Sequence, residues 1–443
     1  MTACFKTNYA PIETDFSDDR VIQKGITYTS PSVKSFQAYE KPLVLTKGDG
    51  CYLWDANGKK YLDLMAQNLC ISVGYNHPLV NSEVKKQMDQ LTHSTAMYVQ
   101  PIPVHYAEEL AATFPKDEEW VVHLVNSGAE AVDVAVMMAR LYTGNLDILA
   151  LENCYHGVQG AAMGVTGMHI FRQPVPLDPN VRHVANPHPY RGVFGDDVEA
   201  YLDDIDHKII SSTSGRIAGF IVEPIQGFGG VVPQPEGYLK KAFERARAAG
   251  GVCIVDEIQT GVTRTGDHYW GFQREDVVPD IITLGKGIGN GFPLSAVVAK
   301  RNIAEAMAGG KKWFNTYGSN PMSSAAGRAV LRAIEEDKTQ QNAKEVGSLL
   351  KTKILELQEK YDLIGDVRGT GLMIGVELVT DRSTKAPAEK EAGQVVEIAK
   401  NNGVIIGKGG VLGNMLRINP PLCIQKEDVR MVADVLDHAF KQC

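Results

Sequence analysis

An acidic residue and a lysine each follow a short apolar run in the middle of the chain. Residues 252–255 lead into Asp256, and residues 281–284 lead through a glycine into Lys286. Short β-branched runs bounded by Gly or Pro are typical of buried parallel strands. Ligands of open α/β sheets bind at the carboxyl ends of such strands. The pattern therefore places a carboxylate and an amine at the same edge of one sheet.

A carboxylate and an amine in this arrangement are the pair that a pyridoxal 5'-phosphate (PLP) site requires. The amine holds the cofactor as a Schiff base, and the carboxylate keeps the pyridine nitrogen protonated so that the ring accepts electrons. A solvated lysine near a structural aspartate would give the same local pattern. The other strand ends decide between these two interpretations.

A Ser-Gly turn follows the apolar run 121–125 and opens a helical stretch. The turn comprises Ser127, Gly128 and Ala129. Backbone N–H groups at a helix N-terminus bind anions, so this turn could hold a phosphate. An ordinary serine N-cap has the same sequence signature.

Two further strand ends carry residues of possible use at this edge. Tyr155 follows the run 147–151, and an aromatic ring there could cover a flat heterocycle or line the edge of the core. Glu223 begins the turn Glu-Pro-Ile-Gln-Gly after the run 218–222. It is either a turn residue facing solvent or part of the same site.

The elements that must position these residues alternate between strand and helix over residues 120–330. Apolar periodicity predicts strands at 121–125, 147–151, 218–222, 252–255, 281–284 and 294–299, and helices at 130–141, 238–249 and 323–335. Such alternation predicts a mostly parallel sheet with helices on both faces.

The ends of the chain have a different pattern. Residues 43–64 predict a β-meander, with turns at Gly48-Asp49-Gly50 and Asn57-Gly58, and residues 1–30 an irregular arm. Residues 340–443 mix amphipathic helices with short strands. We predict three segments: 1–75, the arm and meander, which join a smaller α+β domain; 76–330, the large domain; and 331–443, the rest of the small domain.

Composition narrows the class of protein. The chain has 443 residues, is 44% hydrophobic and carries a net charge of −8. The acidic balance argues against nucleic acid or an anionic membrane as partner, and no apolar run reaches the ~18 residues of a membrane span. The start resembles neither a secretory signal nor a mitochondrial transit peptide. The seven scattered cysteines fit reduced thiols, so a cytoplasmic location is expected.

Other cofactor sites do not fit the sequence. The glycines between 285 and 291 miss the G-x-G-x-x-G spacing, and Gly310-Lys311 lacks the earlier glycine of a phosphate-binding P-loop. His183 and His188 have no clustered cysteine or carboxylate in sequence beside them, so no metal site is predicted.

In order and spacing, from about residue 40 to the C-terminus, the motifs resemble the class III aminotransferases, PLP enzymes of fold type I. The nearest resemblance is to the alanine–glyoxylate / 3-aminoisobutyrate–pyruvate branch. The resemblance to this branch rests on residues 251–261, 284–293, 314–322 and 366–378. The resemblance to the class as a whole rests on residues 126–131, 155–157, 223–227, 256–261 and 286–287. It implies a large domain with a mostly parallel seven-stranded sheet flanked by helices, plus a smaller α+β domain.

The resemblance also implies roles for individual residues. Lys286 would carry the cofactor and move the proton, and Asp256 would pair with the pyridine nitrogen. Arg417 would bind the substrate carboxylate through a charge-assisted fork. The remaining cofactor-binding positions would be Ser127, Gly128, Ala129, Tyr155, Glu223, Ile258, Gln259 and Thr316. Thr316 would reach the phosphate of a neighbouring subunit, which implies a homodimer with composite active sites.

The activity so implied is ping-pong transfer of an amino group. Donors would be alanine or short β- or ω-amino acids such as β-alanine and 3-aminoisobutyrate, and acceptors pyruvate or glyoxylate. Val158 stands where relatives that use 2-oxoglutarate often have Arg, and Phe228 where several of them have an acidic residue. An arginine from another loop could still supply the missing contact. A PLP-dependent lyase or aminomutase, or an inactive binding protein of the same fold, are the alternatives.

Overall fold

The strands whose carboxyl ends carry the predicted site residues lie in one seven-stranded sheet. The computed structural model describes residues 10–443 except 11, 15, 35, 37, 38 and 310. Along the sheet the order is β4 (Trp120–Val125), β12 (Ser295–Lys300), β11 (Ile281–Leu284), β10 (Val252–Asp256), β7 (Gly219–Val222), β5 (Ile148–Leu151) and β6 (Val181–Val184). Strand β12 runs opposite to the other six strands. The expected mostly parallel sheet is confirmed.

Strand β6 is the one strand of this sheet that the sequence did not predict. Its residues, Val181–Val184, include an arginine and a histidine, and the first three are only half-buried. It lies at the edge of the sheet and pairs with β5 alone. An edge strand needs less apolar surface than a central one, so its periodicity is weak.

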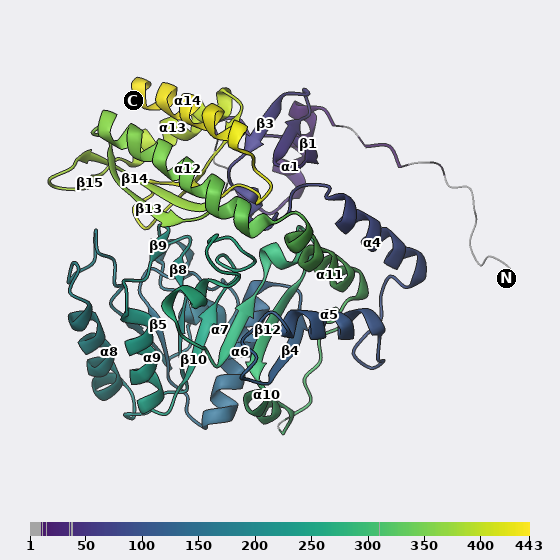
Figure 1. The fold of residues 1–443 in the computed structure, drawn as a ribbon, viewed down its shortest axis with the longest axis vertical. Helices are drawn as coiled ribbons and strands as arrows, with labels where there is room; N and C mark the ends of the chain where they lie inside the picture. The colour runs from purple at the N-terminus through teal and green to yellow at the C-terminus, as the bar shows by residue number, and fades with distance from the viewer. Residues whose placement is uncertain (1–9, 11, 15, 35, 37–38, 310) are drawn as a thin grey trace.

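Helices cover both faces of this sheet and enclose the larger core (Figure 1). They are α4 (Pro78–Gln90), α5 (Pro101–Ala111), α6 (Gly128–Thr143), α7 (Gly160–Val165), α8 (Val198–Ser212), α9 (Tyr238–Ala248), α10 (Arg301–Ala308) and α11 (Pro321–Glu336). Helix α6 follows β4 directly. Ser127 caps its start, and Gly144 ends it in the left-handed region at φ 70°.

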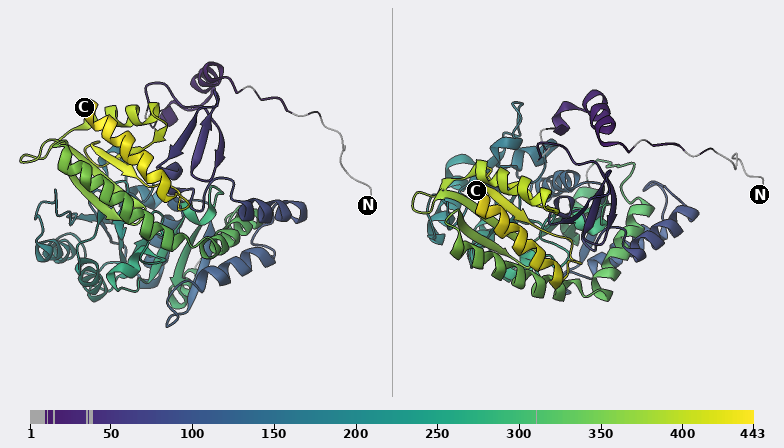
Figure 2. Two further views of the ribbon diagram at one scale, coloured as in Figure 1. Left: turned by 45° about the horizontal axis from the view of Figure 1, so that its top comes forward. Right: turned by 90° about the horizontal axis from the view of Figure 1, so that it is seen from above.

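The small domain is built from both ends of the chain. The meander β1 (Leu45–Asp49), β2 (Tyr52–Asp55), β3 (Lys60–Asp63) is confirmed, and β3 pairs with β16 (Val404–Ile405). A second sheet contains β13 (Ile364–Thr370), β14 (Met373–Asp381), β15 (Ala386–Pro387), β17 (Gly407–Gly409) and β18 (Met415–Ile418). Helices α12 (Thr339–Lys360) and α13 (Glu389–Asn401) pack on it, and α14 (Lys426–Gln442) packs against both helices. The meander stands beside them (Figure 2). The three segment boundaries stay a prediction.

The N-terminal segment differs from the expected irregular arm. Residues Asp18–Tyr28 form helix α1, and Pro31–Lys34 a single turn, α2. Two aspartates in the first turn of α1 favour a helix start through the helix dipole. None of the eleven residues of α1, all of them described, is buried. Because few residues of α1 are apolar, its sequence carries only a weak apolar signal, and the helix was not predicted. The remainder of the predicted arm lies partly outside the described residues.

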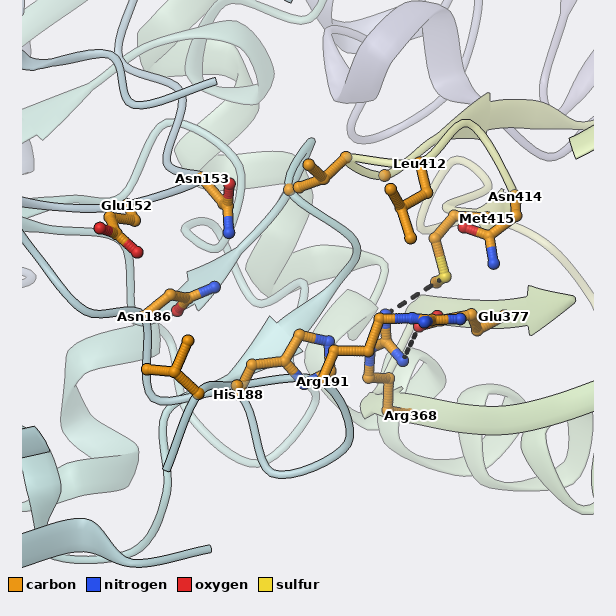
Figure 3. Close-up of a pocket in the computed structure, with 15 residues that line it drawn as sticks. Glu152, Asn153, Asn186, His188, Arg191, Arg368, Glu377, Leu412, Asn414 and Met415 are labelled. Atoms are coloured by element: carbon orange, nitrogen blue, oxygen red, sulfur yellow. Dashed lines mark hydrogen bonds and ion pairs between the residues drawn. The ribbon is translucent and has the colours of Figure 1, made fainter. Parts of the chain in front are cut away.

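A cavity of about 210 Å³ lies between the two domains (Figure 3). Glu377 on β14 is 2% exposed and pairs with both Arg191 and Arg368, the latter at 2.7 Å. Arg368 also donates to the carbonyl of Gly230 at 2.9 Å. A buried carboxylate needs such partners because burial without them is unfavourable. The ion cluster therefore connects the small-domain sheet to the large-domain loops 186–193 and 228–230.

Candidate active site

The parallel pairing of β10 with β11 brings Asp256 and Lys286 to the same edge of the sheet. Asp256 lies opposite Thr283, and Lys286 follows β11 in the short 3-10 turn Lys286–Gly289. Lys286 is half-buried and has a φ of 47°, in the left-handed region that non-glycine residues rarely adopt. Burial lowers the pKa of Lys286, and the charge of Arg417 acts in the same direction. A lowered pKa increases the fraction of neutral, nucleophilic amine.

Asp256 is held in place by a buried histidine. Its Oδ2 lies 2.7 Å from His156 Nδ1, and its Oδ1 accepts from the backbone N–H of Ile258 at 3.0 Å. The His156 side chain is 0% exposed and the Asp256 side chain 4%. Burial opposes the charged imidazole, but Cys154 and Asp256 outweigh it and raise the pKa of His156 well above its usual value. These contacts therefore fix the Asp256 carboxyl group at the end of the strand.

The turn after β4 forms a narrow cradle. Ser127 accepts from the N–H of Glu130 as the N-cap of α6, which leaves the N–H groups of the first helical residues, Gly128 and Ala129, without intrahelical partners. A Cβ on Gly128 would come within 2.7 Å of Ile258 Cδ1. A larger residue would thus push Ile258 away. The cradle suits a phosphate, and Ile258 lies between it and Gly285, whose own Cβ would lie 3.5 Å from Ile258.

Glu223 binds the backbone of two neighbouring loops, one of which carries Tyr155. Its two carboxylate oxygens accept from the backbone N–H of Tyr155 at 3.1 Å and of Gly227 at 2.8 Å. Glu223 is 3% exposed, and burial raises its pKa. It therefore joins the loops that follow β5 and β7 rather than facing solvent in an ordinary turn.

Three aromatic rings form a wall beside these loops. Tyr155 and Phe171 have ring centroids 4.5 Å apart, and Phe171 and Phe228 5.0 Å apart. The Phe228 ring also lies 5.0 Å from the guanidinium carbon of Arg417. An aromatic face attracts a cation at this distance. Phe228, predicted only as a replacement for an acidic residue, thus contacts the predicted carboxylate-binding arginine.

Arg417 lies on β18 of the small domain and is only 1% exposed. Its Nη2 donates to Gln259 Oε1 at 2.9 Å, and its Nη1 to Asn68 Oδ1 at 3.3 Å. Its Nε has no partner in the described part of the chain. Burial lowers the pKa of Arg417 to about 10, and Glu223 opposes that shift. Gln259 was expected to bind the cofactor. Because its Oε1 accepts from Arg417, its Nε2 is the group left to donate.

Asn68 belongs to a strained turn that the sequence did not predict. Residues Ala66–Leu69 form α3, a single turn in which φ lies between 49° and 65° throughout. Each non-glycine residue in this region costs ~1–2 kcal/mol. Asp63 stabilises the start by accepting from Met65 N and Ala66 N. The absence of any glycine in this stretch removed the usual sequence signal.

The loop that carries Thr316 lies beside the phosphate cradle of its own chain. Asn315 Nδ2 donates to Glu130 Oε2 at 3.1 Å, and Glu130 belongs to the first turn of α6. Asn315 Oδ1 accepts from Asn126 at 3.0 Å. Thr316 itself is exposed. The loop is therefore fixed at its base and presents Thr316 outward.

The residues present suit PLP. A phosphate cradle, a buried carboxylate and a lysine of lowered pKa converge at one sheet edge, which is the donor set that this cofactor requires. His156, Phe171 and Asn68 complete the site, and sequence reasoning assigned no role to any of them. His156 stood inside a motif already quoted, Tyr155-His156-Gly157, whereas Phe171 and Asn68 carry no motif.

We expect His156→Leu to destabilise the protein by ~3 kcal/mol, because it leaves the buried charge of Asp256 without its partner. A matched control is His105→Leu, since His105 lies 3.5 Å from Glu108 in an exposed pair and should contribute under ~0.5 kcal/mol. Thermal unfolding followed by circular dichroism compares the two. Equal unfolding midpoints for both variants would contradict the role of the buried pair.

Comparison with known proteins gives relatives over nearly the whole chain. The sequence is 46% identical to "alanine–glyoxylate aminotransferase 2 homolog 2, mitochondrial" of Arabidopsis thaliana, over 98% of this chain and 89% of that protein. It is 39% identical to human "alanine–glyoxylate aminotransferase 2, mitochondrial", over 96% and 86% of the two chains. A solved phospholyase from Arthrobacter in complex with phosphoethanolamine superposes with a TM-score of 0.88 at 31% identity, covering 96% of this chain and all of that one.

The expected cytoplasmic location is wrong. These relatives from Arabidopsis and human are named as mitochondrial proteins, which points away from the cytoplasm. The expectation rested partly on reduced cysteines, but reduced thiols are equally compatible with other reducing compartments. Among the described helices, none has the length and apolar character needed to cross a bilayer.

The family follows from a match that spans most of the molecule. The family model "Aminotransferase class-III" matches residues 35–440. The match includes every predicted site residue. The chain therefore belongs to the class III aminotransferases and is a PLP-dependent transaminase.

Proposed function

We propose that Lys286 holds the cofactor, with Asp256 at its pyridine nitrogen and Ser127, Gly128 and Ala129 at its phosphate. When bound, PLP supplies an electron sink that stabilises negative charge at the substrate α-carbon. The proposal is supported by the convergence of these residues on one sheet edge and by the lowered pKa of Lys286.

The other side chains position the cofactor and move the proton. Ile258 and Tyr155 would lie against its two faces, with Tyr155 fixed through Glu223. Gln259 would donate to the ring hydroxyl through Nε2. The Lys286 amine would take the α-proton of the substrate and return it one atom away, as a general base and then a general acid. His156 would hold the Asp256 carboxyl group in orientation during these steps.

The substrates are proposed to carry a single carboxylate. The observation that carries this conclusion is the buried Arg417, which neutral amides hold and which Phe228 covers on one face. A distal carboxylate against that aromatic wall would lose its hydration without gaining an ionic partner, at several kcal/mol. Relatives are named for alanine and glyoxylate. We propose alanine, β-alanine or 3-aminoisobutyrate as donors and pyruvate or glyoxylate as acceptors.

The acceptor preference can be measured directly. With β-alanine as a fixed donor, kcat/KM for glyoxylate or pyruvate should exceed that for 2-oxoglutarate by at least ~10²-fold, because the second carboxylate has no partner. Phe228→Arg should narrow this difference, and Phe228→Leu serves as its uncharged control. Equal values for the wild-type protein, or a preference for 2-oxoglutarate, would show that the assignment from Val158 and Phe228 is wrong.

A homodimer with composite active sites is the second part of the proposal. Large apolar side chains are exposed on both loops around Thr316: Met97, Tyr98 and Val99 on one, Phe314 and Tyr317 on the other. His93 and Tyr317 connect the two loops, with ring centroids 4.9 Å apart. Contiguous exposed apolar surface of this kind is typical of a protein interface. A second copy of the chain would cover it and bring its own Thr316 to the partner's phosphate.

A heterodimer of two inactive variants tests the composite site. Lys286→Ala removes the catalytic amine, and Thr316→Asp repels the phosphate. If Thr316 acts across the interface, one site of the mixed dimer is intact, so activity should return to about half that of the wild-type dimer. If Thr316 serves its own chain, each site carries one lesion, and the mixed dimer should stay inactive.

A PLP-dependent lyase activity is the alternative to transamination, and one solved structure supports it. The phospholyase from Arthrobacter has the same fold at 31% identity. A lyase releases its leaving group without consuming a 2-oxo acid, whereas a transaminase produces amino acid in proportion to the oxo acid used. Product analysis with phosphoethanolamine alone, and with alanine plus glyoxylate, separates the two.

A further inference from the structure

A substrate-binding arginine that is buried must be held in place without being neutralised. Arg417 is 1% exposed. A carboxylate partner would fix it but would also compete with the substrate carboxylate. Neutral carbonyl oxygens accept from a guanidinium and leave its charge intact. Two amide oxygens, from Gln259 and Asn68, occupy one N–H on each Nη of Arg417.

The guanidinium keeps enough donors for a substrate. Arginine has five N–H groups, and the two amides use two of them. The unpartnered Nε and one N–H on each Nη remain. A carboxylate needs two parallel N–H groups for a bidentate contact. The amides therefore leave the charge of Arg417 intact and three of its five N–H groups unused.

The position of Asn68 depends on an enforced backbone. The left-handed turn Ala66–Leu69 is held at its start by Asp63, which is fully buried and also accepts from Tyr75 Oη at 2.6 Å. After the turn, Asn290 Oδ1 accepts from the N–H groups of Ser72 and Val73. Strain of this kind persists only where the surroundings fix it, and it concentrates at functional sites. The strained turn places the exposed residue Asn68 so that its amide oxygen contacts the buried Arg417.

We propose that Asn68 is the specificity-determining residue of the carboxylate site: it orients Arg417 with a neutral oxygen and so keeps the arginine free to bind a single substrate carboxylate. This inference rests on the proposed function of Arg417. It explains why an amide rather than an acid is needed at the mouth of the site, since an aspartate at the same place would occupy the fork itself.

The test replaces one atom of the side chain. Asn68→Asp keeps the shape and tolerates the left-handed backbone, where Asn and Asp are both enriched, but adds a charge beside Arg417. Propionate is the probe, and its binding to the holoenzyme is measured by calorimetry and by the change in the visible spectrum. We expect binding to weaken tenfold or more in Asn68→Asp. The KM for glyoxylate should rise in parallel, with kcat within twofold.

Two further variants complete the design. Gln67→Glu makes the same charge change on the adjacent exposed residue of the turn and should alter propionate binding by less than twofold. Asn68→Gly relieves the backbone strain and removes the amide, so Arg417 loses an orienting contact while the fold is kept. Its propionate affinity should fall by roughly three- to fivefold.

The variant Arg417→Gln separates the role of Asn68 from the proposed role of Arg417 in binding the carboxylate. If Arg417→Gln abolishes propionate binding while Asn68→Asp binds like the wild type, the role of Asn68 is wrong and that of Arg417 stands. If Arg417→Gln binds propionate as the wild type does, the carboxylate site itself is misplaced, and both fall. A weakening in Gln67→Glu equal to that in Asn68→Asp would also overturn the inference, because general surface charge would then explain it.

Discussion

The parallel pairing of β10 with β11 is the constraint on which the rest of the site depends. Residue pairs along these strands keep Asp256 opposite Thr283. The chain that continues from β11 must therefore place Lys286 beside the carboxylate. The turns after β4, β5 and β7 reach the same edge because those strands run in the same direction. A shift in register along β10 would separate the Lys286 amine from the Asp256 carboxylate, and the two groups could no longer act on one cofactor.

The second constraint comes from the other domain. Arg417 reaches the site from β18, and the glycines of β17 leave room for its stem: a Cβ on Gly409 would lie 2.7 Å from Arg417 Cδ. Arg368, on β13 of the same sheet, donates to the carbonyl of Gly230 in the loop that carries Phe228. The proposed catalytic groups thus belong to the large domain, whereas the arginine proposed to bind the substrate carboxylate belongs to the small domain.

Much of this arrangement could be predicted from sequence because it follows from strand ends. Apolar runs bounded by glycine identified most of the sheet, and the motifs around Asp256 and Lys286 followed from the chemistry of their residue types. Contacts between distant segments could not be predicted this way. Asn68 meets Arg417 across 349 positions of sequence, and its left-handed turn contains no glycine to signal it. Phe171 joins the aromatic wall from a short 3-10 turn, His169–Phe171, that has no periodicity.

In the proposed site the Asp256 carboxylate pairs with the pyridine nitrogen and so sustains the electron sink of the bound cofactor. The most direct test therefore alters that charge alone. In Asp256→Asn the shape is kept and Lys286 is untouched. Transfer of the amino group from alanine in a single turnover, measured as pyruvate formed per active site, should slow by more than ~10²-fold, beyond the effect of one well-placed hydrogen bond. A rate within tenfold of the wild type, at equal cofactor content, would contradict the account.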